Sequence, residues 1–155
     1  MPEKKELECK WSYLDVVENV VTVTDIKHYF YCPKIIYFEK VLHAEPRFTS
    51  QQYESRESHK EIELKDKKRK AAIFYSKEFK NAEKNFKIHL YSDKLNLEGT
   101  LDCLIKFGKE LIPVDYKYTK SNKGKHWMDH KYQLTAYGLL IEEKYNTIIR
   151  RGFVY

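Results

Sequence analysis

The chain has 155 residues, of which 42% are hydrophobic and 34% are charged. This length and composition are typical of one folded domain with a sizeable core, and they exclude a low-complexity chain. The net charge of +6 permits binding to a polyanion. Aromatic residues make up 15% of the chain, and their rings serve either as core or as surfaces on which nucleic-acid bases stack.

The three cysteines, Cys9, Cys32 and Cys103, lie far apart and form no Cys-x-x-Cys pair. Zinc-finger and thioredoxin-type sites are therefore excluded. The odd number and the scatter favour a reducing compartment. The charged N-terminus has no apolar signal segment, and no apolar run approaches the length of a membrane span. We therefore expect a soluble, cytoplasmic protein with no membrane partner.

The first helical region is expected over 24–42, after a polar lead-in over 1–20. Valines over 16–23 indicate a short strand or the edge of a linker. Thr24 is predicted to be the N-cap because Asp25 follows in the first turn, where the helix dipole favours an acid. Pro33 interrupts the helical spacing, so we expect a kink or two shorter helices.

A long, highly charged helix is expected over 50–72, and His59 lies within it. The run 65–70 is strongly basic. Most runs of this kind are solvated helix faces, and contact with phosphates is the less favoured alternative. Short strands are expected at 73–75 and 86–91.

The most informative stretch is a predicted β-hairpin. Apolar and β-branched residues predict strands at 95–107 and 111–118, and the polar break between them has hairpin length. The first strand carries Asp102 and the second carries Asp115. Because strand side chains alternate between faces, Asp115 and Lys117 point the same way, whereas Tyr116 points the other way.

The hairpin places the two aspartates at comparable depth on neighbouring strands. Neighbouring carboxylates repel, and a divalent metal together with Lys117 would offset that repulsion. Hard oxygen ligands of this type hold Mg²⁺ or Mn²⁺ in metal-dependent phosphodiesterases. Alternatively, both aspartates are ordinary edge-strand charges and Asp115 only pairs with Lys117. The spacing favours the site, into which Glu61 and Glu98 could also reach.

Beyond the hairpin we expect a basic loop over 119–126, an amphipathic helix over 127–144 and a final strand over 147–155. The apolar residues predicted to share one side of the helix are Trp127, Tyr132, Leu134, Tyr137, Leu140 and Ile141. Gln133 and Tyr137 are four residues apart and so share a helix face. The order of the elements indicates a mixed α/β domain.

Four motifs follow one another along the chain. They are Arg56-Glu57-Ser58-His59-Lys60-Glu61, Glu98-Gly99-Thr100-Leu101-Asp102, Pro113-Val114-Asp115-Tyr116-Lys117 and Gln133-Leu134-Thr135-Ala136-Tyr137. With Tyr31-Cys32-Pro33-Lys34 in front, the set resembles the PD-(D/E)xK nuclease superfamily, and within it the RecB-like CRISPR-associated exonuclease family. The resemblance runs from about Val21 to Tyr155. It implies a restriction-endonuclease-like α/β core, a central mixed sheet flanked by helices, in a single domain over 1–155.

The resemblance also implies a metal site. The side chains that would bind Mg²⁺ or Mn²⁺ are His59, Asp102 and Asp115, with the main-chain carbonyl of Tyr116 as a further ligand. Lys117 would orient or help to deprotonate the attacking water and would offset charge on the phosphate.

Gln133 and Tyr137 would face the DNA near the scissile bond. The implied activity is an exonuclease that acts on single-stranded DNA ends in CRISPR adaptation, where DNA is trimmed alongside integrase proteins before spacer integration. The basic loop and the 65–70 run would then follow the DNA backbone and make binding sensitive to salt.

One departure concerns an iron–sulfur cluster that this family usually holds with four cysteines. Cys32 matches the first ligand, but Cys9 and Cys103 do not occupy the positions of the others, and the sequence stops before the family's C-terminal cysteine segment. We therefore expect no such cluster in this chain. Absence of the C-terminal segment would expose apolar surface through which the protein associates with itself or with a partner.

Two other readings compete with the nuclease. The first is a non-catalytic module that keeps the nuclease fold and only holds DNA or a protein partner. The complete set of His59, Asp102, Asp115 and Lys117 argues against it, because a binder does not need all four. The second, ranked last, is a basic interaction domain with chance motif matches, which would bind no metal.

Overall fold

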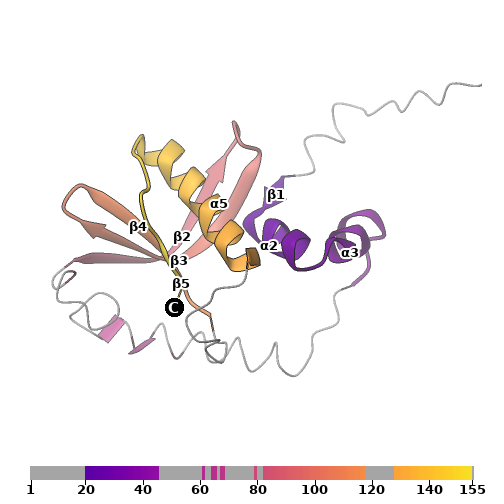
Figure 1. Cartoon of the computed structure of the whole chain (residues 1–155), viewed down its shortest axis with the longest axis horizontal. Coiled ribbons are helices and arrows are strands. Elements are labelled where there is room, and N and C mark those ends of the chain that lie inside the picture. The colour runs from indigo at the N-terminus through magenta and orange to yellow at the C-terminus, as the bar shows by residue number, and fades with distance from the viewer. Residues whose placement is uncertain are drawn as a thin grey trace, which may run out of the picture.

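The computed structural model describes residues 20–45, 61, 64–65, 67–68, 79, 82–117 and 128–154 (Figure 1). Within these residues the strands are β1 (Val21–Thr22), β2 (Glu83–Ser92), β3 (Leu97–Phe107), β4 (Glu110–Asp115) and β5 (Phe153–Val154). The helices are α2 (Val23–Tyr31), α3 (Pro33–Ile36), the π-helix η1 (Tyr37–Val41) and α5 (Met128–Tyr145).

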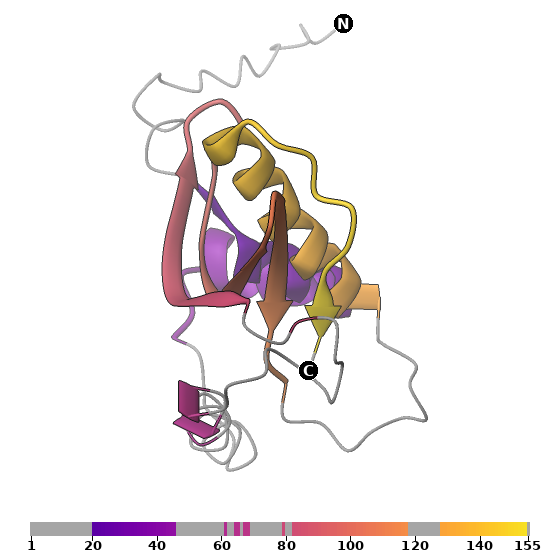
Figure 2. The same cartoon turned by 90° about the vertical axis from the view of Figure 1, so that its left-hand side faces the viewer.

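The strands form one mixed sheet around β3. Strands β2 and β4 pair antiparallel with β3, β1 pairs parallel with it, and β5 runs parallel to β4. Helix α5 lies along one face of this sheet, and α2 lies beside the first turns of α5 (Figures 1 and 2). The predicted α/β fold, with a mixed sheet flanked by helices, is therefore confirmed.

The β3–β4 hairpin turns at Gly108 and Lys109. Phe107 pairs with Glu110 across this turn, and Gly108 has φ +60°, a backbone angle that glycine adopts without strain. Strand β4 thus begins one residue earlier than predicted and ends at Asp115. Residues 95 and 96, predicted as strand, belong to the turn before β3, where Asn96 has φ +47°.

The start of α2 differs from the prediction. Thr22, not Thr24, is the N-cap: its hydroxyl accepts a hydrogen bond from the Asp25 amide at 3.0 Å, and the Asp25 carboxylate accepts one from the Thr22 amide at 2.8 Å. This reciprocal pair is a capping box. The predicted break at Pro33 is confirmed, since Cys32 is extended and separates α2 from α3.

Helix α5 buries a face that is only partly apolar. Tyr137, Leu140 and Ile141 pack against the sheet as predicted, but Tyr132 is 38% exposed. The buried positions that the apolar pattern missed are Asp129, His130, Gln133, Ala136 and Gly138. The hydrophobic core on this side joins α5 to β2, β3 and the start of α2.

A second cluster contains Cys103, Ile105, Ile112, Val114 and Tyr116 together with Phe79. Cys103 is fully buried, as expected for a small hydrophobic residue in a strand. The final strand is shorter than predicted, because only Phe153 and Val154 pair with β4.

Several predictions lie outside the described residues. They concern the lead-in over 1–19, most of the helix over 50–72, the strand at 73–75 and the loop over 119–126. The strand predicted at 86–91 is longer than expected, extending from 83 to 92. Among the helices that the structure describes, none combines the length and the apolar character needed to cross a membrane.

Candidate active site

Asp102 and Asp115 lie opposite each other where β3 and β4 stop pairing. Cys103 pairs with Val114, so the next position in the antiparallel register brings Asp102 to Asp115. The Asp102 carboxylate accepts a hydrogen bond from the Tyr116 amide at 3.0 Å. This bond fixes the chain just beyond β4. The predicted juxtaposition of the two aspartates is thus present.

Asp115 and Lys117 form a buried ion pair. Lys117 Nζ donates a hydrogen bond to Asp115 Oδ1 at 3.0 Å and lies 2.8 Å from Oδ2, with side chains 12% and 4% exposed. Tyr116, between them, is buried in the cluster on the other side of β4. The alternation of faces predicted for these three residues is therefore observed, although Lys117 lies beyond the last paired residue of β4.

Lys87 is a site residue that the sequence did not indicate. Its ammonium group lies 2.7 Å from Asp102 Oδ1, and the lysine is half exposed. The Lys87 backbone has φ +53° in the middle of β2, a left-handed conformation that costs a non-glycine residue about 1–3 kcal/mol. The signal that could have found it is the antiparallel register: Phe86 pairs with Cys103 and Ile88 with Leu101. Lys87 and Asp102 occupy the position between these two pairs.

Helix α5 brings Gln133 and Tyr137 to the same region. The Tyr137 hydroxyl donates a hydrogen bond to the Thr100 carbonyl at 2.8 Å. Burial raises the pKa of Tyr137 well above its usual range, and the charges of Asp115 and Asp102 raise it further. Tyr137 is therefore a neutral hydrogen-bond donor that packs α5 onto β3.

Two further charged residues complete this region. Lys27 of α2 is half-buried, and burial together with the nearby Lys117 lowers the pKa of its ammonium group, while Asp115 and Asp129 oppose that shift. Asp129 is buried at the start of α5, 3.6 Å from the His130 ring. Sequence reasoning missed both residues, because they meet only when α2 packs on α5.

The site is rich in buried oxygen atoms. Within the described part of the chain, Gln133 Oε1 is buried and has no hydrogen-bond partner, and Asp115 Oδ2 is buried with the Lys117 ammonium 2.8 Å away. Burial raises the pKa of Asp115 above its usual range, and Lys117 opposes that shift. Buried oxygens without donors are uncommon, and carboxylate oxygens are the ligands that Mg²⁺ and Mn²⁺ prefer. The donor set fits a divalent metal.

The predicted ligand set is only partly described. His59 lies outside the described residues, and the described residues alone hold no cluster of three or more His, Cys, Asp or Glu side chains suited to a metal. Glu61 is exposed and pairs with Lys65 at 3.2 Å. Glu98 lies across from Tyr91 on β2. Neither glutamate is seen to contact the aspartates.

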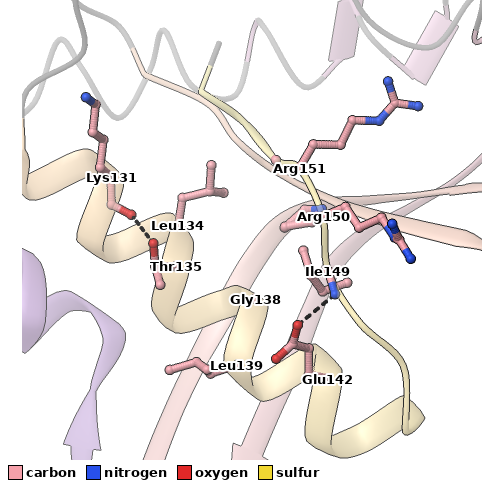
Figure 3. Close-up of a pocket in the computed structure, with 11 residues that line it drawn as sticks. Lys131, Leu134, Thr135, Gly138, Leu139, Glu142, Ile149, Arg150 and Arg151 are labelled. Atoms are coloured by element: carbon pink, nitrogen blue, oxygen red, sulfur yellow. Dashed lines mark hydrogen bonds between the residues drawn. The ribbon is translucent and has the colours of Figure 1, made fainter.

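A separate hollow of about 420 Å³ opens between α5 and residues 149–152 (Figure 3). Leu134, Gly138 and Ile149 lie along it, and the Glu142 carboxylate accepts a hydrogen bond from the Ile149 amide at 2.7 Å. The side chains of the two arginines that follow Ile149 point away from the helix. None of the site carboxylates lines this hollow.

Two opposed aspartates followed by a lysine are the arrangement that the sequence motifs predicted. A comparison of the sequence with models of protein families gives the same result. The family described as the PD-(D/E)XK nuclease superfamily matches residues 2–152. The chain belongs to the PD-(D/E)XK nuclease superfamily. The predicted restriction-endonuclease-like core is accordingly confirmed.

Two curated proteins match most of the chain. "CRISPR-associated exonuclease Cas4" of Francisella tularensis subsp. novicida is 28% identical over 132 residues, which are 84% of this chain and 64% of that protein. The protein of the same name from Aeropyrum pernix is 29% identical over 125 residues, 78% of this chain and 60% of that protein. The chain spans less than two thirds of these relatives. The predicted resemblance to the CRISPR-associated exonucleases is confirmed.

Proposed function

We propose that this chain is a metal-dependent exonuclease that hydrolyses phosphodiester bonds at the ends of single-stranded DNA. The observation that carries the proposal is the buried Asp115 carboxylate, which lies opposite Asp102 and pairs with the Lys117 ammonium. The names of the two relatives support the exonuclease class.

Asp102, Asp115 and the Tyr116 carbonyl are the described groups that would hold Mg²⁺ or Mn²⁺, with His59 as the fourth. Such a metal lowers the pKa of a bound water and stabilises charge that develops on the phosphate. Lys117 positions the attacking water and offsets the phosphate charge. Gln133 and Tyr137 orient the strand beside the carboxylates.

The biological setting that we propose is CRISPR adaptation. There the chain would process single-stranded ends before spacer integration, together with integrase proteins. The support is the name of the two relatives. The basic character of the chain, with a net charge of +6, suits a polyanionic substrate.

The proposal is tested by cleavage of end-labelled single-stranded DNA with Mn²⁺, using separate 5′ and 3′ labels. We expect the native chain to shorten the strand from one end, and EDTA, Asp115→Ala and Lys117→Ala each to abolish the reaction. Asp93→Ala and Lys109→Ala are matched controls, because both residues lie in exposed turns of the sheet and should leave cleavage unchanged. Equal cleavage by native chain and Asp115→Ala would reject this site.

A second function, a nuclease fold that only binds DNA or a protein partner, is favoured by one observation. Each site carboxylate already carries a lysine partner, Lys87 on Asp102 and Lys117 on Asp115. If the native chain binds the labelled strand but leaves it intact with Mn²⁺ and with Mg²⁺, this second function replaces the first.

A further inference from the structure

A pair of aromatic rings bridges α2 and α5 without being buried. Phe30 and Tyr132 stack with ring centroids 3.6 Å apart and planes within 9° of parallel. Their residues are 44% and 38% exposed, whereas Tyr137, which also holds α5 to its neighbours, is 4% exposed. A contact that served only to join two helices gains most when it is buried. The exposure of this pair needs another reason.

The ring pair lies one helical turn from the charged site. Phe30 follows Lys27 by three residues on α2, and Tyr132 follows Asp129 by three residues on α5, so each ring shares a helix face with one of these charged groups. Lys27 in turn interacts with Asp115, Lys117 and Asp129. One turn of helix is about 5.4 Å, so each ring stands about that far along its helix from Lys27 or Asp129, which adjoin the carboxylate site.

The surroundings of the pair suit a nucleic-acid strand. Tyr29 meets Phe30 edge to face at 5.6 Å and is 54% exposed, which extends the aromatic surface. Lys131, next to Tyr132 in the chain, is exposed. Exposed rings beside cationic side chains are the arrangement by which proteins hold unpaired bases while their phosphates are neutralised.

We propose that the Phe30–Tyr132 pair is a stacking platform for an unpaired base of single-stranded DNA, next to the nucleotide whose phosphate reaches Asp102 and Asp115. This inference deepens the proposed nuclease function and rests on it for the identity of the strand. It gives α2 a role in holding the substrate. It would also favour single strands, because a paired base must leave its own stack, at a cost of a few kcal/mol, to reach the rings.

The test compares the DNA affinities of the native chain and a variant in EDTA, where no metal-dependent cleavage occurs. Fluorescence anisotropy compares a twelve-residue oligothymidylate with an abasic strand of equal length and charge, for the native chain and for Tyr132→Ala. We expect Tyr132→Ala to weaken binding of the thymidine strand by about fivefold or more. Its binding to the abasic strand should not change. Tyr132→Phe keeps the ring and should bind as the native chain does.

Tyr145→Ala is the matched control, since Tyr145 is an exposed tyrosine at the far end of the same helix, 45% exposed. Equal weakening of both strands by Tyr132→Ala, or none, would overturn the platform. Far-ultraviolet circular dichroism confirms that each variant is folded. If Tyr132→Ala weakens binding of the thymidine strand alone but the native chain never cleaves DNA with Mn²⁺, the platform is supported and the nuclease function is rejected. If the native chain cleaves DNA but Tyr132→Ala weakens both strands equally or neither, the nuclease function is supported and the platform is rejected.

Discussion

The two ends of β4 each carry an acid paired with a base, and the two pairs differ in kind. At the first residue, Arg151 donates two hydrogen bonds to the Glu110 carboxylate, each 2.8 Å long. At the last, Asp115 is buried against a single ammonium group, which lies 3.0 Å from one carboxylate oxygen and 2.8 Å from the other. The Arg151 hydrogen bond lowers the pKa of Glu110, whereas burial raises that of Asp115.

This difference indicates that the Glu110–Arg151 pair stabilises the fold, whereas the Asp115–Lys117 pair is available for chemistry. A two-pronged guanidinium donates to both oxygens of a partly exposed carboxylate in a fixed geometry. A lysine beside a buried carboxylate is a single point charge and leaves lone pairs on the two oxygens for a further ligand, at a cost in desolvation. The same strand thus holds a structural acid at one end and a reactive one at the other.

The largest contrast is expected in turnover. Asp115→Asn keeps the shape of the side chain and removes its charge, so cleavage of single-stranded DNA with Mn²⁺ should fall by about a hundredfold or more. Glu110→Gln makes the same chemical change at the other end of β4 and should leave turnover within about twofold of native, roughly the scatter of such a measurement. Comparable losses in both variants would erase the distinction between the two ends.

Close packing near the reactive end should make Gly99 intolerant of a side chain. A Cβ there would lie 2.8 Å from Val23 Cγ2 and 2.9 Å from the Tyr137 ring, both buried. Gly99→Ala should therefore cost about 1–3 kcal/mol in the free energy of unfolding by urea. In Gly138→Ala the nearest atom is 3.7 Å away, and this helical position should gain up to about 1 kcal/mol. An unchanged free energy of unfolding in Gly99→Ala would show that α5 does not pack closely against β3 at this position.

The hydroxyl of Tyr137 should contribute a smaller amount. Tyr137→Phe leaves the Thr100 carbonyl without its donor in a buried setting, which costs about 1–2 kcal/mol. Thermal unfolding would show this as a lower midpoint. Tyr145→Phe, on the same helix but exposed, provides the control and should not move the midpoint.

The smallest effect is expected at Glu110. The partly exposed pair with Arg151 contributes less than about 1 kcal/mol. Because the folded-state pKa of Glu110 is lowered, its contribution is complete above the ordinary glutamate value of about 4.3 and is lost as the pH falls through the lower folded value. The stability difference between native chain and Glu110→Gln should thus be present at pH 7 and shrink as the pH falls below the ordinary glutamate value of about 4.3. A difference that grew on acidification would contradict the pairing.

The local part of the site followed from the sequence. The alternation of strand side chains and the short turn at Gly108 were enough to place Asp102 opposite Asp115 and Lys117 on the same face. These relations depend on residues within about twenty positions of one another. Strand side chains alternate between the two faces of the sheet, and the turn has a known length. These two rules determine the relative positions of the three residues without knowledge of the rest of the fold.

The remainder depended on packing between distant segments. Lys27 and Asp129 are about a hundred positions apart and are joined only by the contact between α2 and α5, for which no local pattern exists. The N-cap was misplaced because Thr22 and Thr24 are both good caps. The parallel pairing of Thr22 with Glu98 in the sheet selects the earlier one.

The left-handed backbone of Lys87 also bears on aggregation. Strand β2 has ten residues, and among the described strands it pairs only with β3. A long regular strand with one unpaired side is a template on which another chain can extend the sheet. The reversed angle at Lys87 divides that side into two short stretches, which shortens the edge on which a foreign strand could pair. The residue that neutralises Asp102 thereby also protects the sheet from growing by addition of foreign strands.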